Sequence, residues 1–151
     1  MNLETKEKLM RIAMEEATKA FEEGNSPFGA VLTDVDGNII AISHNTTNTS
    51  IDPTAHAEIN LIRQITKQLT SKDLSAYYLI SNAQSCAMCF AAAIKAKISH
   101  FIYGYGEDET LTPQINVFEM NKYCKQKANI ETGILKEECK TQLEEIRKKM
   151  Q

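Results

Sequence analysis

The sequence predicts a single α/β domain in which helices cover both faces of a central sheet, a three-layer α-β-α sandwich. Its length of 151 residues suits one domain with one core. Its composition, 42% hydrophobic and 25% charged, is ordinary for a globular protein. Short β-prone runs alternate with longer segments of helical periodicity, the pattern of α/β domains. No repeat or long Pro/Gly/Ser linker divides the chain, so we expect residues 1–151 to form one domain.

The first third of the chain predicts one helix and a pair of strands. Apolar residues recur at helical spacing from Met10 to Phe21, and Gly24 and Pro27 then stop the helix. Two β-prone runs follow, and Asp36-Gly37 between them is typical of a tight turn. A segment made almost entirely of Asn, Thr and Ser predicts a polar loop. The strands are predicted over residues 28–33 and 39–43, and the loop over residues 45–52.

The middle of the chain predicts two helices on either side of a buried strand. Asp52-Pro53-Thr54 is typical of a helix start. A short β-prone run over residues 77–81 comes next, and Ser85 can cap a third helix over residues 86–96. The buried side of the second helix is predicted to consist of Ala55, Ile59, Ile62, Ile65 and Leu69.

The last third adds two strands and two helices. A β-prone run over residues 98–103 ends at a pair of glycines, and Thr112-Pro113 favours the start of a fourth helix that runs toward Lys125. Residues 130–132 predict a short final strand. The apolar face of the last helix is predicted to consist of Leu135, Cys139, Leu143, Ile146 and Met150.

Several classes of protein are excluded at this point. The longest apolar run, residues 86–94, is far shorter than the roughly 20 residues of a membrane-spanning helix. The N-terminus has no apolar signal core, so we expect a cytoplasmic protein without membrane contact. Seventeen basic and twenty acidic residues give a net charge of −3, without a basic block that would neutralise several phosphates. We therefore expect no nucleic-acid partner.

Two short motifs carry the chemistry. One is His56-Ala57-Glu58, and the other is the pair Cys86 and Cys89, three residues apart. In a reducing compartment a close cysteine pair binds metal or does redox work more often than it forms a disulfide. One imidazole and two thiolates supply three ligands for a zinc ion whose fourth position stays open for water. Cys86 and Cys89 share one helix face, and the helix N-terminus favours their thiolates.

The role of Glu58 follows from its spacing to His56. Residues at positions i and i+2 of a helix do not face each other. Both side chains can reach one centre only if the metal lies off the N-terminal end of the helix, which the Asp52-Pro53 start allows. Glu58 would then lie beside the water rather than on the metal. There it can take a proton from the water and deliver it to a leaving amine.

Other interpretations of these motifs stay open. A structural zinc site would need a fourth protein ligand, for which Cys124 or Cys139 is available, although Cys139 fits the buried face of the last helix. A redox pair would leave His56 and Glu58 unexplained. The combination of H-x-E and C-x-x-C, each at the start of a helix, is instead the pattern of zinc-dependent deaminases.

Further segments show that the sequence resembles the cytidine and deoxycytidylate deaminase superfamily. The segment from Ser26 to Val31, then Asn45, then the segment from Asp52 to Glu58 are similar to the branch that contains bacterial guanine deaminases and tRNA adenosine deaminases. The resemblance implies a mixed five-stranded sheet, a homodimer, and one zinc ion per chain. The implied roles are zinc ligands at His56, Cys86 and Cys89, a proton shuttle at Glu58 and a base-contacting amide at Asn45.

One departure from the family concerns the segment before the first cysteine. The family has Glu-Pro there, whereas this chain has Gln84-Ser85. Since Ser85 can cap the helix, we expect zinc binding to survive. The loop near the leaving amine is expected to be reshaped, so a non-catalytic module stabilised by zinc remains an alternative to an active deaminase.

The substrate is expected to be a small amino-purine, guanine or a close relative, that is deaminated hydrolytically. Ser26-Pro27-Phe28 resembles the guanine deaminase loop, and Glu107-Asp108-Glu109 places acids where RNA would pass. The tail with Gly133-Ile134-Leu135 is instead similar to tRNA adenosine deaminases, which we keep as the alternative. The residues expected to contact the base are Phe28, Asn45, Ala57 and Glu109.

Overall fold

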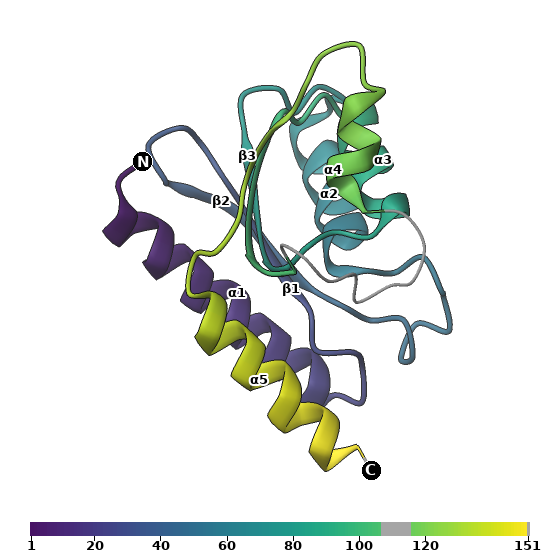
Figure 1. Cartoon of the computed structure of the whole chain (residues 1–151). Helices are drawn as coiled ribbons and strands as arrows, with labels where there is room; N and C mark the ends of the chain where they lie inside the picture. The colour runs from purple at the N-terminus through teal and green to yellow at the C-terminus, as the bar shows by residue number, and fades with distance from the viewer. Residues whose placement is uncertain (107–115, 151) are drawn as a thin grey trace.

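The fold is the predicted α/β sandwich. A computed structural model describes residues 1–106 and 116–150 (Figure 1). Its helices are α1 (Leu3–Glu22), α2 (Ala57–Leu69), α3 (Ala87–Lys95), α4 (Val117–Lys122) and α5 (Lys136–Lys149). Its strands are β1 (Gly29–Thr33), β2 (Ile39–His44), β3 (Tyr78–Ala83), β4 (His100–Tyr105) and β5 (Asn129–Glu131).

The five strands form one mixed sheet in the order β2-β1-β3-β4-β5, as the resemblance implied. β1 pairs antiparallel with both β2 and β3, whereas β3, β4 and β5 run parallel. Because β3 and β4 are parallel, their carboxyl ends lie at the same edge of the sheet. That edge leads directly into Cys86 and α3.

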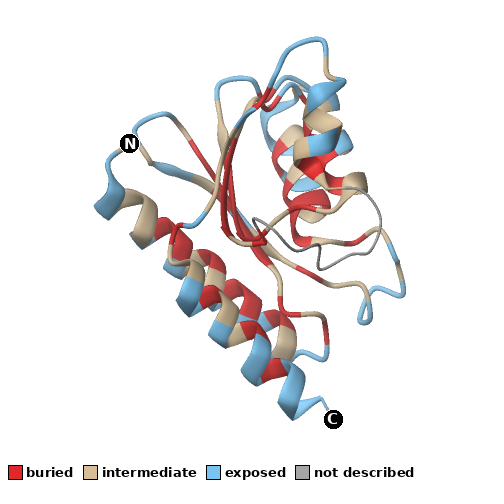
Figure 2. Ribbon diagram, in the orientation of Figure 1, coloured by how far each residue is buried: buried red, intermediate tan, exposed pale blue. Residues whose placement is uncertain are grey.

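Helices cover both faces of the sheet and divide its side chains into two cores (Figures 1 and 2). α1 and α5 lie side by side on one face, and α2, α3 and α4 cover the other. Successive strand residues point to opposite faces, so β1 places Val31 toward α1 and Leu32 toward α2. All five residues of β1 are buried, which explains its uninterrupted apolar sequence.

The start of β1 lies tightly against α1, and this contact requires a glycine. A Cβ atom on Gly29 would lie 2.1 Å from the backbone oxygen of Ala13 and 2.7 Å from Cβ of Glu16. From β3, the buried Asn82 accepts a hydrogen bond from the Gly29 N–H and donates one to the carbonyl of Pro27. These contacts fix the corner that carries Phe28.

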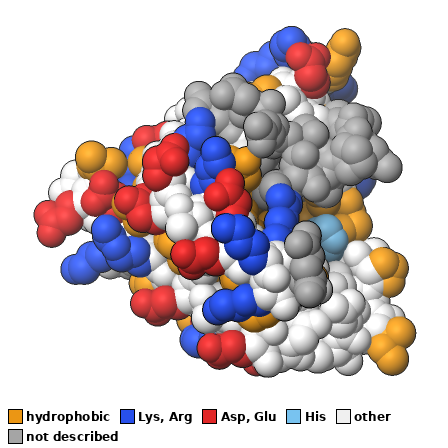
Figure 3. Space-filling view, turned by 60° about the horizontal axis from the view of Figure 1, so that its bottom comes forward, with side chains coloured by type: hydrophobic (Ala, Val, Ile, Leu, Met, Phe, Trp, Pro, Cys, Tyr) orange, Lys and Arg blue, Asp and Glu red, His pale blue; other side chains and the backbone are white. Residues whose placement is uncertain are grey.

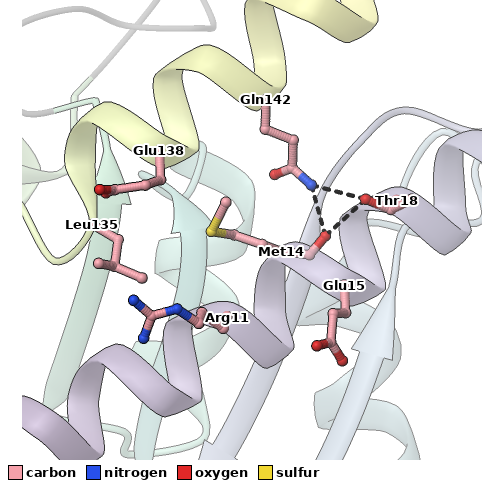
Figure 4. A pocket seen from close by; sticks show the side chains of 7 residues that line it. All are labelled: Arg11, Met14, Glu15, Thr18, Leu135, Glu138 and Gln142. Carbon is pink, nitrogen blue, oxygen red and sulfur yellow. Dashed lines mark hydrogen bonds between the residues drawn. The ribbon is translucent and has the colours of Figure 1, made fainter.

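α5 packs along α1 through shared apolar residues and through the side chain of Gln142. The Gln142 side-chain amide donates to the carbonyl of Met14 at 2.8 Å and to the hydroxyl of Thr18 at 3.0 Å (Figure 4). A surface pocket of about 340 Å³ lies between the two helices, with Arg11 and Glu138 on its walls. This pocket contains none of the predicted site residues.

Two helices begin later than the sequence predicted. α2 begins at Ala57, because the Asp52 carboxylate accepts hydrogen bonds from the backbone N–H and the hydroxyl of Thr54 and so forms a separate turn. α3 begins at Ala87 with Cys86 as its N-cap residue, whereas the buried Ser85 hydroxyl makes no hydrogen bond within the described residues. The predicted start of the fourth helix at Thr112-Pro113 lies outside the described residues.

The surface carries both signs of charge without a segregated patch on the face shown in Figure 3, where acidic and basic side chains are intermingled. None of the helices in the described ranges combines the length and the hydrophobicity that a bilayer crossing requires.

Candidate metal centre and active site

Three predicted ligands converge where α2 and α3 begin. His56 is the N-cap residue of α2, Cys86 is the N-cap residue of α3, and Cys89 lies in the first turn of α3. The Nδ1 atom of His56 lies 3.6 Å from Sγ of Cys86 and 3.4 Å from Sγ of Cys89. All three ligand atoms lie within 4.8 Å of one another. The two segments are thirty residues apart in sequence and meet only in the folded chain.

The spacing of these atoms fits a zinc ion. Zinc–sulfur and zinc–imidazole bonds in a tetrahedral site place a nitrogen and a sulfur ligand about 3.6 Å apart. The two N···S distances of 3.6 and 3.4 Å match this separation. A set of three protein ligands leaves the fourth position open, as in catalytic rather than structural zinc sites.

The electrostatics of the two sulfurs also favour a cation. A hydrogen bond from Cys89 is the main reason that the pKa of Cys86 falls to about 4, and His56 adds to the effect. The hydrogen bond that Cys89 makes to Cys86, together with burial, raises the pKa of Cys89. One proton is therefore retained between the two sulfurs when no metal is present. A bound cation stabilises both thiolates, so the cysteine pair then has no need to retain this proton.

Glu58 lies in the first turn of α2 and lines the same pocket as His56. His56 has extended backbone angles just outside the helix, whereas Glu58 is inside it, which lets both side chains reach one corner. The Glu58 carboxylate is not part of the cluster of ligand atoms. Burial raises the pKa of Glu58 above its ordinary value. A carboxyl with a raised pKa can accept and return a proton near neutral pH.

A pocket of about 240 Å³ opens at this corner. It brings together most of the predicted site residues: Phe28, Asn45, His56, Glu58 and Cys86. Cys89 is fully buried behind them. Ala57, predicted to contact the base, is also fully buried and is not among the residues that line the pocket. Glu109 lies outside the described residues, so the structure describes no contact for it.

Four further residues line the pocket that sequence reasoning did not select: Ser26, Ser81, Ala83 and Gln84. Ser81 and Ala83 belong to the carboxyl end of β3, where ligand sites of α/β sheets commonly form, and this rule was the available signal. Gln84, noted only as a departure from the family, accepts a hydrogen bond from the Val117 N–H and donates to the carbonyl of Gly106. Its side chain therefore joins the end of β4 to the start of α4.

The two remaining histidines lie elsewhere. His44 lies between the carboxylates of Glu16 and Glu23, at 2.8 Å from each. His100 begins β4 and stacks on Tyr78, with ring centroids 4.2 Å apart. Since Tyr78 begins β3 and the pocket lies at that strand's other end, His100 is remote from the metal ligands.

Comparison with known proteins gives relatives named tRNA-specific adenosine deaminase. The chain is 34% identical over 139 residues to the tRNA-specific adenosine deaminase of Haemophilus influenzae, covering 91% of this chain and 80% of the relative. It is also 34% identical over 149 residues to the enzyme of the same name from Bacillus subtilis, covering 93% and 89%.

The similar solved structures come from both branches that the sequence resembles, the tRNA adenosine deaminases and the guanine deaminases. A structure from studies of A-to-I editing by tRNA:A34 deaminases has a TM-score of 0.77 and 32% identity, and the match covers 90% of this chain and 99% of that one. The Nitrosomonas europaea guanine deaminase has a TM-score of 0.78 at 22% identity, with 94% and 84% covered. The Bacillus subtilis guanine deaminase has a TM-score of 0.62 at 26% identity, with 84% and 98% covered. The Nitrosomonas likeness establishes the fold alone.

The two tRNA-specific adenosine deaminases and the tRNA:A34 deaminase structure contradict our prediction of a guanine-deaminase-like enzyme without a nucleic-acid partner. They favour the alternative, a tRNA adenosine deaminase. The prediction relied on the likeness of Ser26-Pro27-Phe28 to the guanine deaminase loop, on net charge and on three acids at residues 107–109, which lie outside the described residues. Net charge sums over the whole surface, whereas RNA binding depends on the charges around the contact. Three consecutive acids therefore do not exclude RNA.

The family itself is established by a separate match. The model of the cytidine and deoxycytidylate deaminase zinc-binding region matches residues 3–105, which contain all three converging ligands and Glu58. Because that match spans more than half of the chain, the protein belongs to the cytidine and deoxycytidylate deaminase family.

Proposed function

We propose that the protein deaminates adenosine to inosine in transfer RNA, with an adenosine at the wobble position of the anticodon as its target. The observation that carries this proposal is the likeness to the tRNA:A34 deaminase structure, which extends over 99% of that chain at 32% identity. The tRNA-specific adenosine deaminases of two other bacteria support it with matches over most of their length.

The pocket suits one base. Its volume of about 240 Å³ has no room for paired bases. An enzyme that acts on a base within RNA must therefore take that base from a loop, or flip it out of its stack. Under this proposal Phe28 offers an aromatic face to the base, and Asn45 offers an amide to its edge.

The reaction adds water at C6 of adenine and releases ammonia, leaving a carbonyl at that carbon. His56, Cys86 and Cys89 would hold a zinc ion, which supplies the Lewis acidity that makes water a nucleophile near neutral pH. Glu58 takes one proton from the water and passes it to the departing amino group, and the second proton of the water ends on N1 of the base when the carbonyl forms. Burial suits Glu58 to both steps because it stabilises the protonated carboxylic acid as the intermediate carrier.

The test compares RNA with free bases. Zinc-loaded protein is incubated with a tRNA anticodon stem-loop that carries adenosine at the wobble position, with the same stem-loop carrying that adenosine in the stem, and with free guanine. Inosine formation and ammonia release are measured at two salt concentrations. We expect turnover of the first stem-loop only, and we expect it to fall with salt because phosphate contacts release counterions.

Two results would contradict the proposal. Turnover of guanine without turnover of the stem-loop would show that the enzyme acts on a free base. Full zinc loading without turnover of any substrate would favour the non-catalytic module. The homodimer implied by the resemblance belongs to the same proposal, and sedimentation should give twice the chain mass of 16.9 kDa.

A further inference from the structure

The carboxamide of Asn45 is held in one orientation by a residue that does not line the pocket. Asn45 follows the end of β2 and is only 2% exposed, yet it forms part of the pocket wall. Its oxygen, Oδ1, accepts two hydrogen bonds, from the backbone N–H of Thr47 at 3.0 Å and from the hydroxyl of Thr47 at 2.9 Å. Both of its acceptor positions are therefore used inside the protein.

The backbone N–H of Thr47 determines which atom of the Asn45 carboxamide is the oxygen and which is the nitrogen. A backbone N–H can only donate, so the Asn45 atom that faces Thr47 must be the carbonyl oxygen and not the amino group. The amino group, Nδ2, has no hydrogen-bond partner within residues 1–106 and 116–150. A nearly buried amino group without a protein partner has unmet donor capacity, and a ligand in the pocket can meet it.

The segment that carries both residues is held from three sides. The Asn45 N–H donates to the carbonyl of Phe28 at 3.0 Å, and the Thr46 N–H donates to the carbonyl of Ala55 at 3.0 Å. The side chain of Asn60, on α2, donates to the carbonyl of His44 and to the hydroxyl of Thr46. Thr47 therefore presents its two donors from a fixed position, and the Asn45 carboxamide is the part that could otherwise rotate.

We propose that Thr47 is a positioning residue that keeps the N–H donors of Asn45 directed at the substrate, so that the pocket selects a base with a hydrogen-bond acceptor at that edge. The proposal rests on the proposed deaminase function. Thr47 itself touches no substrate and acts only through Asn45. Without its hydroxyl the carboxamide would lose one of the two bonds that oppose rotation, and the donor would face the pocket for less of the time.

The activity test uses a double-mutant cycle. Thr47→Val removes the hydroxyl at nearly constant volume, and Thr47→Ser retains it. We expect Thr47→Val to lower kcat/KM by about three- to twelvefold, the range of one neutral hydrogen bond, and Thr47→Ser to restore activity. In an Asn45→Ala background Thr47→Val should have no further effect, because the group that it positions is gone. Thr66→Val, which removes a hydroxyl on α2 that bonds to carbonyls of its own helix, is the matched control and should leave kcat/KM unchanged.

A further variant tests the donor. Asn45→Asp keeps an oxygen for Thr47 but replaces the amino group with a second acceptor. We expect it to lose at least as much activity as Asn45→Ala. Wild-type activity in Asn45→Asp would overturn the proposal. So would a loss of activity from Thr47→Val in the Asn45→Ala background that is as large as its loss in the wild-type background.

The double-mutant cycle uses whichever substrate the wild-type protein deaminates. Failure of the tRNA assay alone therefore does not contradict the positioning role of Thr47. A structural measurement needs no turnover. In deuterated, zinc-loaded protein, a scalar coupling across the hydrogen bond between the Thr47 amide nitrogen and the Asn45 carboxamide carbon should be detectable, and it should persist in Thr47→Ser. Its absence from the wild-type protein would show that the carboxamide is not held by Thr47, whatever the substrate proves to be.

Discussion

Glu58 combines two properties that rarely occur together in a carboxylate. Its side chain is only 5% exposed, yet it forms no part of the metal ligand cluster and lies on the wall of a pocket. A buried carboxylate is costly, so burial raises its pKa, and a structural role would be better served by an apolar residue. The cost is understandable if the group must change protonation state during the reaction.

We therefore predict different effects of Glu58→Gln on catalysis and on metal binding. Glutamine has nearly the same shape but cannot carry a proton between two oxygens. We expect zinc content and thermal stability to remain close to wild type, while turnover falls by about 10²–10⁴-fold, the usual contribution of general acid–base catalysis. Metal analysis and an ammonia assay on the same preparation check both parts. Normal turnover would remove the shuttle role, and loss of zinc would make Glu58 a ligand.

The contact between α1 and β2 contains a pair of carboxylates with a histidine between them. His44 at the end of β2 lies 2.8 Å from both Glu16 and Glu23, and Lys19 lies 2.6 Å from the buried Glu16. Burial opposes protonation of His44, but the hydrogen bonds to both carboxylates outweigh it and the pKa of His44 is raised. The protonated imidazole therefore joins the helix to the edge strand that leads into Asn45.

This arrangement predicts how stability changes with pH. Because the pKa of His44 is higher in the folded than in the unfolded protein, its stabilising contribution is complete below the unfolded value of about 6.5. The contribution is lost as pH rises through the raised pKa of the folded protein. We expect the melting temperature of wild type to exceed that of His44→Gln by more at about pH 5.5 than at about pH 8.5. An equal difference at both values would show that the charge of His44 does not contribute.

The boundaries of α2 and α3 show where local patterns stop being informative. The hydrophobic periodicity of both helices is a property of the chain itself, and it predicted the presence of both. The buried side of α2 was predicted only in part, because Leu69 is 42% exposed and the fully buried Leu61 was not predicted. Asp52 and Ser85 are typical helix-capping residues, but Asp52 bonds to Thr54 instead, and Ser85 makes no capping bond. The actual N-cap residues are His56 and Cys86, neither of which caps through its side chain. Both belong to the cluster that could hold a metal ion, so the site and not local propensity accounts for their place at these helix starts.

The candidate site likewise has one part that local sequence patterns predict and another part that depends on the fold. The spacing of His56, Cys86 and Cys89 predicted the cluster of ligand atoms, because both motifs had been placed at helix starts. The contributions of Ser81 and Gln84 depend on where β3 ends relative to α2 and β4, which no local pattern contains. The substrate was the hardest inference, since two enzymes on this fold can share a pocket and differ only in what surrounds it.

Across the whole molecule, a zinc ion held by the predicted ligands would cross-link α2 and α3, two of the three helices that cover one face of the sheet. His56 precedes α2 and Cys86 precedes α3, so a zinc ion bound to both closes a loop that includes α2 and β3. A ligand that binds only the folded chain stabilises it in proportion to the logarithm of its concentration over the dissociation constant. Zinc should therefore contribute to the stability of the fold as well as to its chemistry.

We predict one zinc ion per chain and a melting temperature that falls when a chelator removes it. Cys86→Ser and Cys89→Ser should each lose most of the bound zinc and melt at the temperature of the chelated wild type. Cys124→Ser is the matched control, because Cys124 is half-buried, lies outside the ligand cluster and should leave both quantities unchanged. Zinc uptake should also release a proton from the cysteine pair, since the bound cation favours two thiolates where the free site retains one proton. Equal zinc content in wild type and Cys89→Ser would refute the three-ligand site, because the open fourth position of a catalytic centre depends on all three protein ligands being present.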